Sequence, residues 1–379
     1  MTNNKDKKVL NVPNLRFPEF TGEWASYKIS DILRIGNGKD YKHLNKGDIP
    51  VFGTGGQITS VNECLYDGET TFIGRKGTIN KPFYYNGKFW TVDTLFYTHS
   101  FKIVEPKFVY CLFQTINWLR YNEASGVPSL SKDTIEKIKV NIPRIEEQKK
   151  ISLLLFAIEE RIMLQNKIIE KYESLIQAII YQKKMDGIRE GNWQKTELSK
   201  VLQERTEKNI NGYTVCSVSV SQGVINQIEY LGRSFAAKET SHYNIVKYGD
   251  IVYTKSPTGD FPYGIVKRSY IKNAVAVSPL YGVYKPINDN IGVFLHFYFM
   301  QSNNAFNYLH PLIQKGAKNT INITNARFLE NSIPLPKTED EVVYIANALT
   351  SIQTKIDLEK SLLCSYEKEK QYLLRQMFI

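Results

Sequence analysis

The sequence lacks any long run of apolar side chains. Its longest nearly continuous apolar stretch, residues 151–158, is interrupted by Ser152 and is far shorter than the roughly 20 residues that span a bilayer. The first 12 residues are polar and rich in lysine, without the apolar core of a secretory signal. We therefore expect a cytoplasmic protein that makes no membrane contact.

Cysteine and histidine are scarce. The four cysteines, spread over 379 residues, form no C-x-x-C pair, and the five histidines form no H-x-x-x-H pair. A disulfide framework and a zinc site both need closer spacings of such residues. We expect no metal site and no cofactor on this chain.

Sequence motifs of the common catalytic folds are missing as well. There is no phosphate-binding G-x-x-x-x-G-K-[ST] loop and no G-x-S-x-G elbow. Residues 52–56 and 278–281 only faintly echo the cofactor loop and the catalytic tetrad of a methyltransferase. Asp93 followed by residues 105–107 fits a nuclease site loosely, because the central proline cannot donate within a strand. We expect a non-catalytic binding protein.

Positive charge, in contrast, is abundant. Lysine and arginine total 49 against 38 acidic residues, which gives a net charge of +11. Residues 1–140 hold 19 basic and 14 acidic side chains, and residues 186–335 hold 16 and 11, so these two segments carry nearly all of the excess. Such a surplus is typical of proteins that bind a polyanion, above all nucleic acid. On charge alone, a basic protein without such a partner is an equal alternative.

The chain contains an internal duplication. Residues 24–33 (WASYKISDIL) align with residues 193–202 (WQKTELSKVL), and both segments open with tryptophan. Residues 142–162 align with residues 333–356 after a three-residue insertion. We interpret the chain as two globular target recognition domains, each followed by a long helix. The expected boundaries are 1–141 and 186–335 for the domains and 142–185 and 336–379 for the helices.

Both long helices carry apolar residues at alternating spacings of four and three. Such heptads keep one seam facing a partner helix, which is the signature of a coiled coil. Gln165 and Glu359 interrupt the two seams at matching places, and they either fix the register or open the seam to water. Because a globular domain separates the helices, we expect them to pair antiparallel within one chain. The expected seam residues are Ile151, Leu155, Ile158, Ile162, Ile169, Ile345, Leu349, Ile352, Ile356 and Leu363.

The globular domains show short aromatic strands between turn signals, which predicts a mixed α and β architecture and an α+β fold class. The expected strands are residues 69–75, 81–86 and 250–255, with turns at 86–87 and 257–259. Short helices are expected over residues 107–121 and 291–309.

Basic, glycine-containing turns lie at matching places in the two domains. The first pair is residues 74–78 and 255–259, and the second pair, residues 124–132 and 315–319, precedes the last segment of each domain. Glycine permits close backbone approach, arginine and lysine reach phosphates and guanine edges, and asparagine can pair with adenine. Ordinary surface turns would explain the same residues. The candidate DNA-binding residues are Gly74, Arg75, Lys76, Thr78, Lys132, Lys255, Thr258, Lys315, Lys318 and Asn319.

Three short motifs, arranged around the duplication, resemble the specificity (S) subunit of type I restriction-modification systems. The first is LRFPEF at residues 15–20, followed by Trp24. The second is Pro143 with EQKKI at residues 147–151, and the third is LRQMF at residues 374–378. The resemblance covers essentially the whole chain.

The resemblance implies that each globular domain reads one half of a split double-stranded DNA site through the major groove. It implies that the helices space the two halves and dock two methyltransferase subunits, which supply S-adenosylmethionine and adenine methylation. Two restriction subunits would add ATP- and magnesium-dependent translocation and cleavage. Because the two domains share little beyond their framework, we expect an asymmetric site.

One position departs from the family pattern, since Val342 stands in the second helix where Gln148 stands in the first. The two helices therefore need not dock a partner equally. Two alternatives remain: a coiled-coil adaptor that does not read DNA, and an intrinsic DNA methyltransferase. Steep salt dependence of DNA binding would separate a DNA reader from an adaptor. Tight binding of S-adenosylmethionine by the isolated chain would identify a methyltransferase.

Overall fold

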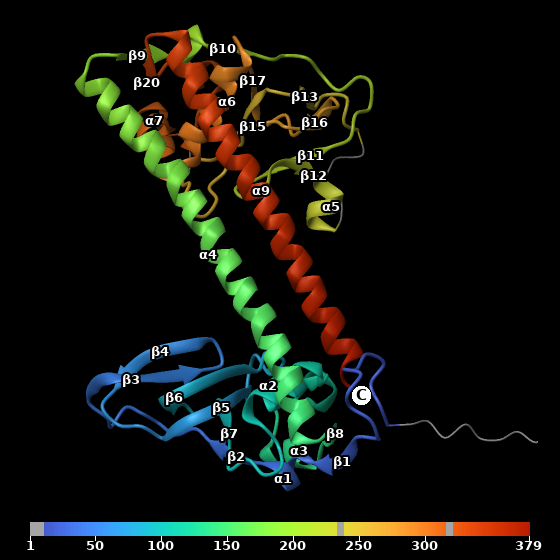
Figure 1. The fold of residues 1–379 in the computed structure, drawn as a ribbon. Helices are drawn as coiled ribbons and strands as arrows, with labels where there is room; N and C mark the ends of the chain where they lie inside the picture. Colours follow the sequence, from blue (N-terminus) through green and yellow to red (C-terminus); the bar gives the residue numbers. More distant parts are fainter. Residues whose placement is uncertain (1–10, 233–238, 316–320) are drawn as a thin grey trace, which may run out of the picture. The chain divides into compact units, whose positions relative to one another are not determined.

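The computed structural model describes residues 11–232, 239–315 and 321–379, and the chain forms two compact units (Figure 1). Unit 1 comprises Met1–Asn166 with Ser361–Ile379, and unit 2 comprises Lys167–Lys360. Each long helix is therefore divided between the two units and does not form a compact domain of its own.

Unit 1 is built on a six-stranded sheet. Its strand order is β2-β7-β5-β6-β3-β4, and the described neighbours are antiparallel except for the parallel pair β3 and β6. The strands are β2 (Arg34–Asn37), β3 (Lys46–Gly53), β4 (Gly56–Val61), β5 (Tyr66–Gly74), β6 (Phe83–Thr91) and β7 (Leu95–His99).

Alternate side chains of these strands point to opposite faces of the sheet. Ile73 and Phe96 enter the main hydrophobic cluster of unit 1, together with apolar residues of α2 (Pro106–Thr115). Their neighbours Phe72 and Leu95 enter a separate, largely aromatic cluster. The centre of the sheet is thus buried on both faces.

Unit 2 has a smaller sheet of order β10-β17-β14-β15, with α6 (Asp289–Met300) packed against β15. These strands are β10 (Leu202–Glu204), β14 (Ile251–Tyr253), β15 (Val266–Arg268) and β17 (Gly282–Pro286). Three two-stranded ribbons accompany it: β11 (Cys216–Ser219) with β12 (Gly223–Asn226), β13 (Asn244–Val246) with β16 (Val275–Val277), and β18 (Gln314–Lys315) with β19 (Ile321–Asn322). The short helices are α5 (Gln227–Leu231), α7 (Ser302–Leu309) and α8 (Asn325–Phe328).

The duplication reappears as a shared topology. In unit 1, β1 (Ala25–Lys28) pairs antiparallel with β8 (Lys139–Ile142). In unit 2, β9 (Trp193–Glu197) pairs antiparallel with β20 (Ser332–Pro336). In each unit the strand beside the aligned tryptophan therefore pairs with the strand that leads into a long helix. Unit 1 also contains two further short helices, α1 (Ile29–Ile32) and α3 (Lys132–Lys137).

The two long helices are α4 (Ile145–Arg189) and α9 (Glu339–Gln376), drawn green and red in Figure 1. Both begin three residues later than predicted, because β8 extends to Ile142 and β20 to Pro336, and two further residues separate each strand from its helix. The helix α4 also continues past the predicted end at 185, to Arg189. Within this extension the Trp193 ring packs directly against Gly187, where an added Cβ would come within 1.9 Å of the ring.

The helices pair antiparallel within each unit, and the α+β class with two long helices is confirmed. In unit 1, Glu159 of α4 forms an ion pair of 2.5 Å with Lys370 of α9. In unit 2, Glu173 pairs with Lys360 at 2.7 Å, and the Lys183 ammonium lies 5.4 Å from the ring centre of Tyr344. As the residue number increases along α4, the number of the residue that it contacts on α9 decreases, as expected for antiparallel helices.

The predicted seam residues fall into two groups. Ile162, Ile352 and Leu363 are half-buried, with the polar Glu359 likewise half-buried and Gln165 buried. A strict heptad would place the next buried residue after Ile176 at position 179, but the buried residue is Ile180. A straight helix needs about 3.6 residues per turn rather than 3.5, so its buried face drifts to later positions. The remaining seam residues are buried, namely Ile151, Leu155, Ile158, Ile169, Ile345, Leu349 and Ile356.

Three predictions of local structure need correction. The expected turn at Asn86-Gly87 is wrong, since both residues lie inside β6 and pair with Glu69 and Gly68 of β5. The helix expected over 107–121 stops at Thr115 and is followed by a separate 3₁₀ turn, η1 (Trp118–Tyr121). The helix expected over 291–309 is two helices, α6 and α7, that meet at Gln301.

Candidate nucleic-acid interface

The strongest candidate site is a groove of about 460 Å³ in unit 1, where two predicted segments meet. The backbone N–H of Gly77 donates to the carbonyl of Pro128 at 2.8 Å, and the N–H of Leu130 donates to the carbonyl of Arg75 at 2.9 Å. These bonds fix the turn after β5 against the segment before α3. Residues of two segments that were predicted separately, more than 50 positions apart, therefore line one surface.

Two glycines allow this turn to form. A Cβ on Gly74 would come within 2.1 Å of the carbonyl oxygen of Thr78, so only glycine fits there. Gly77 has φ +85°, a conformation that other residues rarely adopt. Gly74 thus acts through the backbone, and Thr78 is exposed beside the groove without lining it.

Three cations line the groove in different states. The half-buried Arg75 lies with its guanidinium 5.8 Å from the ring centre of Phe96, and its Nη1 donates to the carbonyl of Asp93 at 3.3 Å. Lys76 is exposed. Lys132, the first residue of α3, pairs weakly with Glu136 at 3.7 Å. The groove therefore presents one oriented guanidinium and two ammonium groups.

The groove also contains residues that the sequence analysis missed, including Asn37, Glu123 and Ser131. The Glu123 carboxylate accepts from the hydroxyl and the backbone N–H of Ser131, at 2.7 and 3.2 Å, and from the hydroxyl of Thr134. Hydrogen bonds from Thr134 and Ser131 lower the pKa of Glu123. Ser131 also caps α3, and its position just before a helix was the one signal in the sequence that could have identified it.

In unit 2 the structure places Lys255 differently from the DNA contact that the matching turns of the two domains suggested. Its ammonium donates to the side-chain oxygen of Asn325 at 2.5 Å, and the Asn325 amide in turn donates to Glu204 at 2.7 Å. Lys255 has φ +59°, and burial lowers the pKa of its ammonium. The half-buried side chain is therefore part of a network that joins β10, the segment after β14, and α8.

The other predicted residues of unit 2 are less informative. Thr258 is exposed in a turn closed by mutual backbone hydrogen bonds with Phe261, both 3.0 Å. The side chain of Lys315, together with Lys318 and Asn319, lies outside the described residues.

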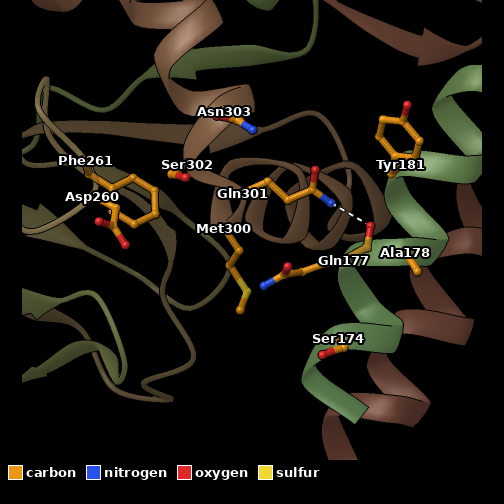
Figure 2. A pocket seen from close by; sticks show the side chains of 10 residues that line it. All are labelled: Ser174, Gln177, Ala178, Tyr181, Asp260, Phe261, Met300, Gln301, Ser302 and Asn303. Carbon is orange, nitrogen blue, oxygen red and sulfur yellow. Dashed lines mark hydrogen bonds between the residues drawn. The ribbon is translucent and has the colours of Figure 1, made fainter. Parts of the chain in front are cut away.

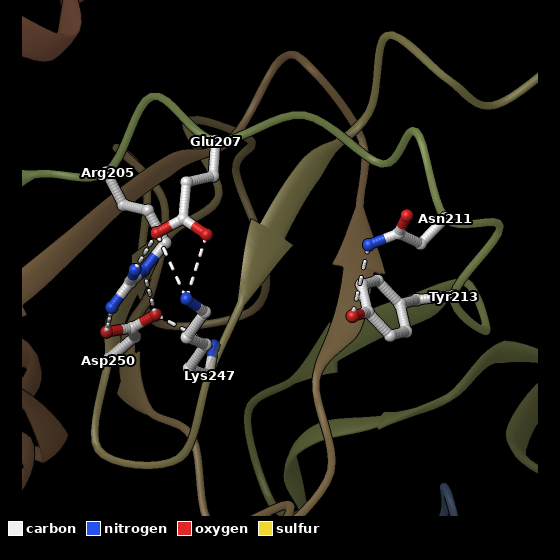
Figure 3. A network of polar contacts seen from close by, with 6 residues as sticks. All are labelled: Arg205, Glu207, Asn211, Tyr213, Lys247 and Asp250. Carbon is white, nitrogen blue, oxygen red and sulfur yellow. Dashed lines mark hydrogen bonds and ion pairs between the residues drawn. The ribbon is translucent and has the colours of Figure 1, made fainter.

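Further charged groups of unit 2 are engaged in internal ion pairs. Figure 3 shows Arg205 bound through two nitrogens to the buried carboxylate of Asp250, at 2.6 and 2.9 Å. Glu207 bridges Arg205 and Lys247, with a Lys247–Glu207 distance of 2.8 Å. Hydrogen bonding to Asp250 raises the pKa of Arg205. This network holds the segment after β10 against the start of β14.

Arg268 is also internal. It is 1% exposed, lies 4.7 and 4.5 Å from the ring centres of Tyr248 and Tyr270, and pairs with Asp289. Among the described residues, its Nε and Nη1 have no hydrogen-bond partner. The buried Arg268 and the half-buried Lys255 are therefore both bound to groups of unit 2 itself.

A second cavity, of about 500 Å³, lies in unit 2 between α4 and the junction of α6 and α7 (Figure 2). The amide of Gln301 spans this space and donates to the backbone carbonyl of Gln177 at 2.9 Å. Its lining is neutral except for Asp260. Without a basic side chain the cavity is a poor site for nucleic acid.

The two units share one further constellation at the start of each long helix. The indole N–H of Trp24 donates to Glu147 at 3.3 Å, and the indole N–H of Trp193 donates to Glu341 at 2.8 Å. Both acids are the third residue of their helix. The aligned tryptophans thus donate the same hydrogen bond to the first turn of a long helix in both repeats.

Val342 stands where the first helix has Gln148, but this difference does not alter the surface of the helix. Gln148 is fully buried, and its amide bonds to the N–H of Glu105 and to the carbonyls of Ile103 and Pro143, at 2.9 to 3.0 Å. Val342 is likewise buried, with 4% exposure. Neither side chain is available to a docked partner.

Several residues of the faint catalytic motifs have structural roles. Phe52 and Gly53 end β3, and Thr54 and Gly55 form the turn into β4. Glu105 caps α2 by accepting from the N–H of Phe108 at 2.9 Å.

Within the described parts of the chain, no helix has the length and apolar character needed to cross a membrane.

Comparisons with known proteins agree with this architecture. A family model for the type I restriction modification DNA specificity domain matches residues 21–174 and 195–365. A putative type I specificity subunit of Mycoplasma pneumoniae, S.MpnORF365P, is 28% identical over 205 residues, which cover 47% of this chain and 70% of that relative. The specificity subunit of the type I restriction enzyme MpnII from the same organism is 29% identical over 158 residues, 36% of this chain and 44% of its own.

The fold has a solved counterpart. The crystal structure of a type I restriction-modification system S subunit from M. genitalium superimposes with a TM-score of 0.67 at 12% identity, covering 97% of this chain and 99% of the other. The two matched segments coincide with the two repeats, each of which has its own paired first and last strands. The chain therefore belongs to the type I restriction-modification DNA specificity family and carries two copies of its domain.

Proposed function

We propose that the two specificity domains read the two halves of a split, asymmetric site in double-stranded DNA. The observation that carries this proposal is the contrast between a common frame and different surfaces. Both units pair their first and last strands and bind a tryptophan to the third residue of a long helix. Yet unit 1 lines a groove with cations, whereas the half-buried Lys255 and the buried Arg268 of unit 2 are bound to side chains of their own unit. Different surfaces read different half-sites.

The groove of unit 1 has the chemistry for such reading. Lys76 and Lys132 can contact phosphates, which give affinity and position the protein on the duplex. Arg75 is held in one orientation by Phe96 and by the Asp93 carbonyl, so it can pair with a guanine through two hydrogen bonds.

We further propose that the long helices dock two methyltransferase subunits, and that restriction subunits can join the assembly. S-adenosylmethionine, ATP and magnesium would then be bound by those partners, and this chain would be non-catalytic. The roles found for Phe52, Gly53 and Glu105 support this division, because they account for three of the residues that faintly resembled catalytic motifs. The same assembly would work in the cytoplasm, where its DNA lies.

The test is a methylome measured with single-molecule sequencing. The chain is expressed with its neighbouring methyltransferase in a host that lacks adenine methylation, beside a control without the chain. We expect a split motif with two different halves that appears only when the chain is present. A motif with two identical halves would contradict the asymmetric reading, and no motif from a soluble, co-purifying pair would contradict the DNA-reading role.

A further inference from the structure

In unit 1 an arginine from the chain's own N-terminal segment covers the corner formed by Trp24 and Glu147. The Arg16 guanidinium binds both oxygens of Glu147, at 2.8 and 2.7 Å, and leaves the acid only 2% exposed. The next residue, Phe17, lies with its ring centre 4.7 Å from the ammonium of Lys150. This corner is therefore a filled site for an arginine followed by an aromatic residue.

Within the part of unit 2 that the structure describes, no such segment lies at the matching corner. Trp193 donates to one oxygen of Glu341, as Trp24 does to Glu147. However, only three residues, 190–192, connect α4 to β9, so the chain has no counterpart of residues 11–23 here. Among the described residues, no cation pairs with Glu341, which is half-buried rather than enclosed.

An exposed aromatic ring lies beside this acid. Tyr344 follows Glu341 by three residues, as Lys150 follows Glu147, and it is 64% exposed. The first turn of α9 adds the exposed acids Glu339 and Asp340. A guanidinium matches a carboxylate through two parallel hydrogen bonds and also stacks on aromatic rings, which an ammonium cannot do equally well.

We propose that the corner formed by Trp193, Glu341 and Tyr344 binds a segment of a partner protein that carries an arginine followed by an aromatic residue. The arginine binds both oxygens of Glu341, as Arg16 binds both oxygens of Glu147, and the aromatic residue packs against Tyr344. The filled corner of unit 1 is the template for this occupant. The inference does not depend on which DNA sequence the chain reads.

The test uses the chain's own segment as the probe. A synthetic peptide of residues 11–21, NVPNLRFPEFT, is labelled and titrated with the full-length protein while fluorescence anisotropy is recorded. We expect saturable binding that weakens about tenfold or more when the peptide carries Arg16→Ala, because a bidentate ionic contact is lost. Glu341→Gln in the protein should weaken binding equally, although glutamine still accepts from Trp193.

Asp340→Asn is the matched control, since it removes one negative charge from the same helical turn. We expect it to leave peptide affinity within about twofold of wild type, because an exposed charge acts weakly at moderate salt. Melting temperatures confirm that each variant is folded. Absent peptide binding, equal affinity of wild type and Glu341→Gln, or equal losses for Glu341→Gln and Asp340→Asn would each overturn the proposal.

Discussion

Lys76 and Lys255 occupy matching turns in the two repeats but differ in their surroundings. Lys76 is exposed at the edge of a groove, whereas Lys255 is half-buried and donates to Asn325. The difference follows from what lies across each turn. In unit 1 the turn faces a backbone segment, and in unit 2 it faces a side chain with an acceptor.

Lys76→Ala should weaken DNA binding without affecting stability. Loss of one phosphate contact should cost about 1 kcal/mol and lower the slope of affinity against salt by about one. The measurement is a titration of a duplex that contains the target site, at several salt concentrations. Lys137→Ala is the control, since Lys137 lies on α3 outside the groove and pairs with Asp133 at 2.5 Å. Equal effects of the two substitutions would argue against the groove.

Lys255→Ala should instead destabilise the fold. Removing the ammonium leaves the side-chain oxygen of Asn325 without its charged donor, at a cost of about 1–3 kcal/mol. Chemical denaturation of the variant measures this cost. Lys195→Ala, at an exposed lysine of unit 2, should change stability by less than about 0.5 kcal/mol. An unchanged Lys255→Ala protein would mean that the network is not needed for the fold.

His296 should make unit 2 sensitive to acid. It is buried, its Nδ1 accepts from the N–H of Arg268 at 3.2 Å, and burial lowers its pKa from 6.5 to about 3. The unfolded chain therefore takes up a proton near pH 6.5 that the folded chain refuses, so stability falls as the pH drops below 6.5. The expected loss between pH 6.5 and pH 5 is about 2 kcal/mol.

The comparison with His296→Gln isolates this contribution, because glutamine can accept the same hydrogen bond but does not titrate. Denaturation at pH 7 and pH 5 should show a smaller pH effect in this variant than in wild type. His310→Gln, at an exposed histidine, should retain the wild-type pH effect. If wild type and His296→Gln lose the same stability at pH 5, other groups cause the acid sensitivity.

At the scale of elements, the long helices were the easiest part to predict and the turns the hardest. A heptad repeats over many residues, so the apolar period identified α4 and α9 despite polar residues in the seam. Asn86-Gly87 is a common turn signal, but here the ladder between β5 and β6 runs through it. Pairing with a neighbouring strand overrode the local preference.

Ile158→Asp should destabilise unit 1 by about 3–5 kcal/mol, since it buries a charge without a partner. Ile158 is 6% exposed and belongs to the cluster that includes Leu373 and Met377 of α9. Leu153→Asp is the control on the same helix, at a position 72% exposed. Thermal unfolding should separate the two variants by many degrees, and equal melting temperatures would refute the packing of α4 against α9.

At the scale of the whole molecule, the duplication could be detected in the sequence because the residues that align between the repeats have the same structural role in both. The tryptophans and the acids that follow them by long sequence distances hold the same corner in both repeats. The recognition surfaces were not predictable to the same degree. They depend on which side chains meet across turns, as with Glu123 and Ser131, and no periodic pattern encodes those meetings.

The intact chain, assembled with its partners, should bind its target DNA with steep salt dependence. The logarithm of affinity should fall linearly with the logarithm of salt concentration, by about 0.9 per phosphate contacted. Titrations between 50 and 200 mM salt, typical for such an analysis, measure the slope. A slope near zero would favour an adaptor that holds proteins together and does not read DNA.

The pairing of the first strand with the last has a further consequence. In each unit the chain enters and leaves the recognition region at neighbouring backbone positions, joined by β1 with β8 or by β9 with β20. A region whose two ends are adjacent can be lengthened, shortened or replaced while its attachment points stay fixed. Recombination within these strands can thus replace one recognition region. The protein then acquires a new target sequence while its helices remain the same.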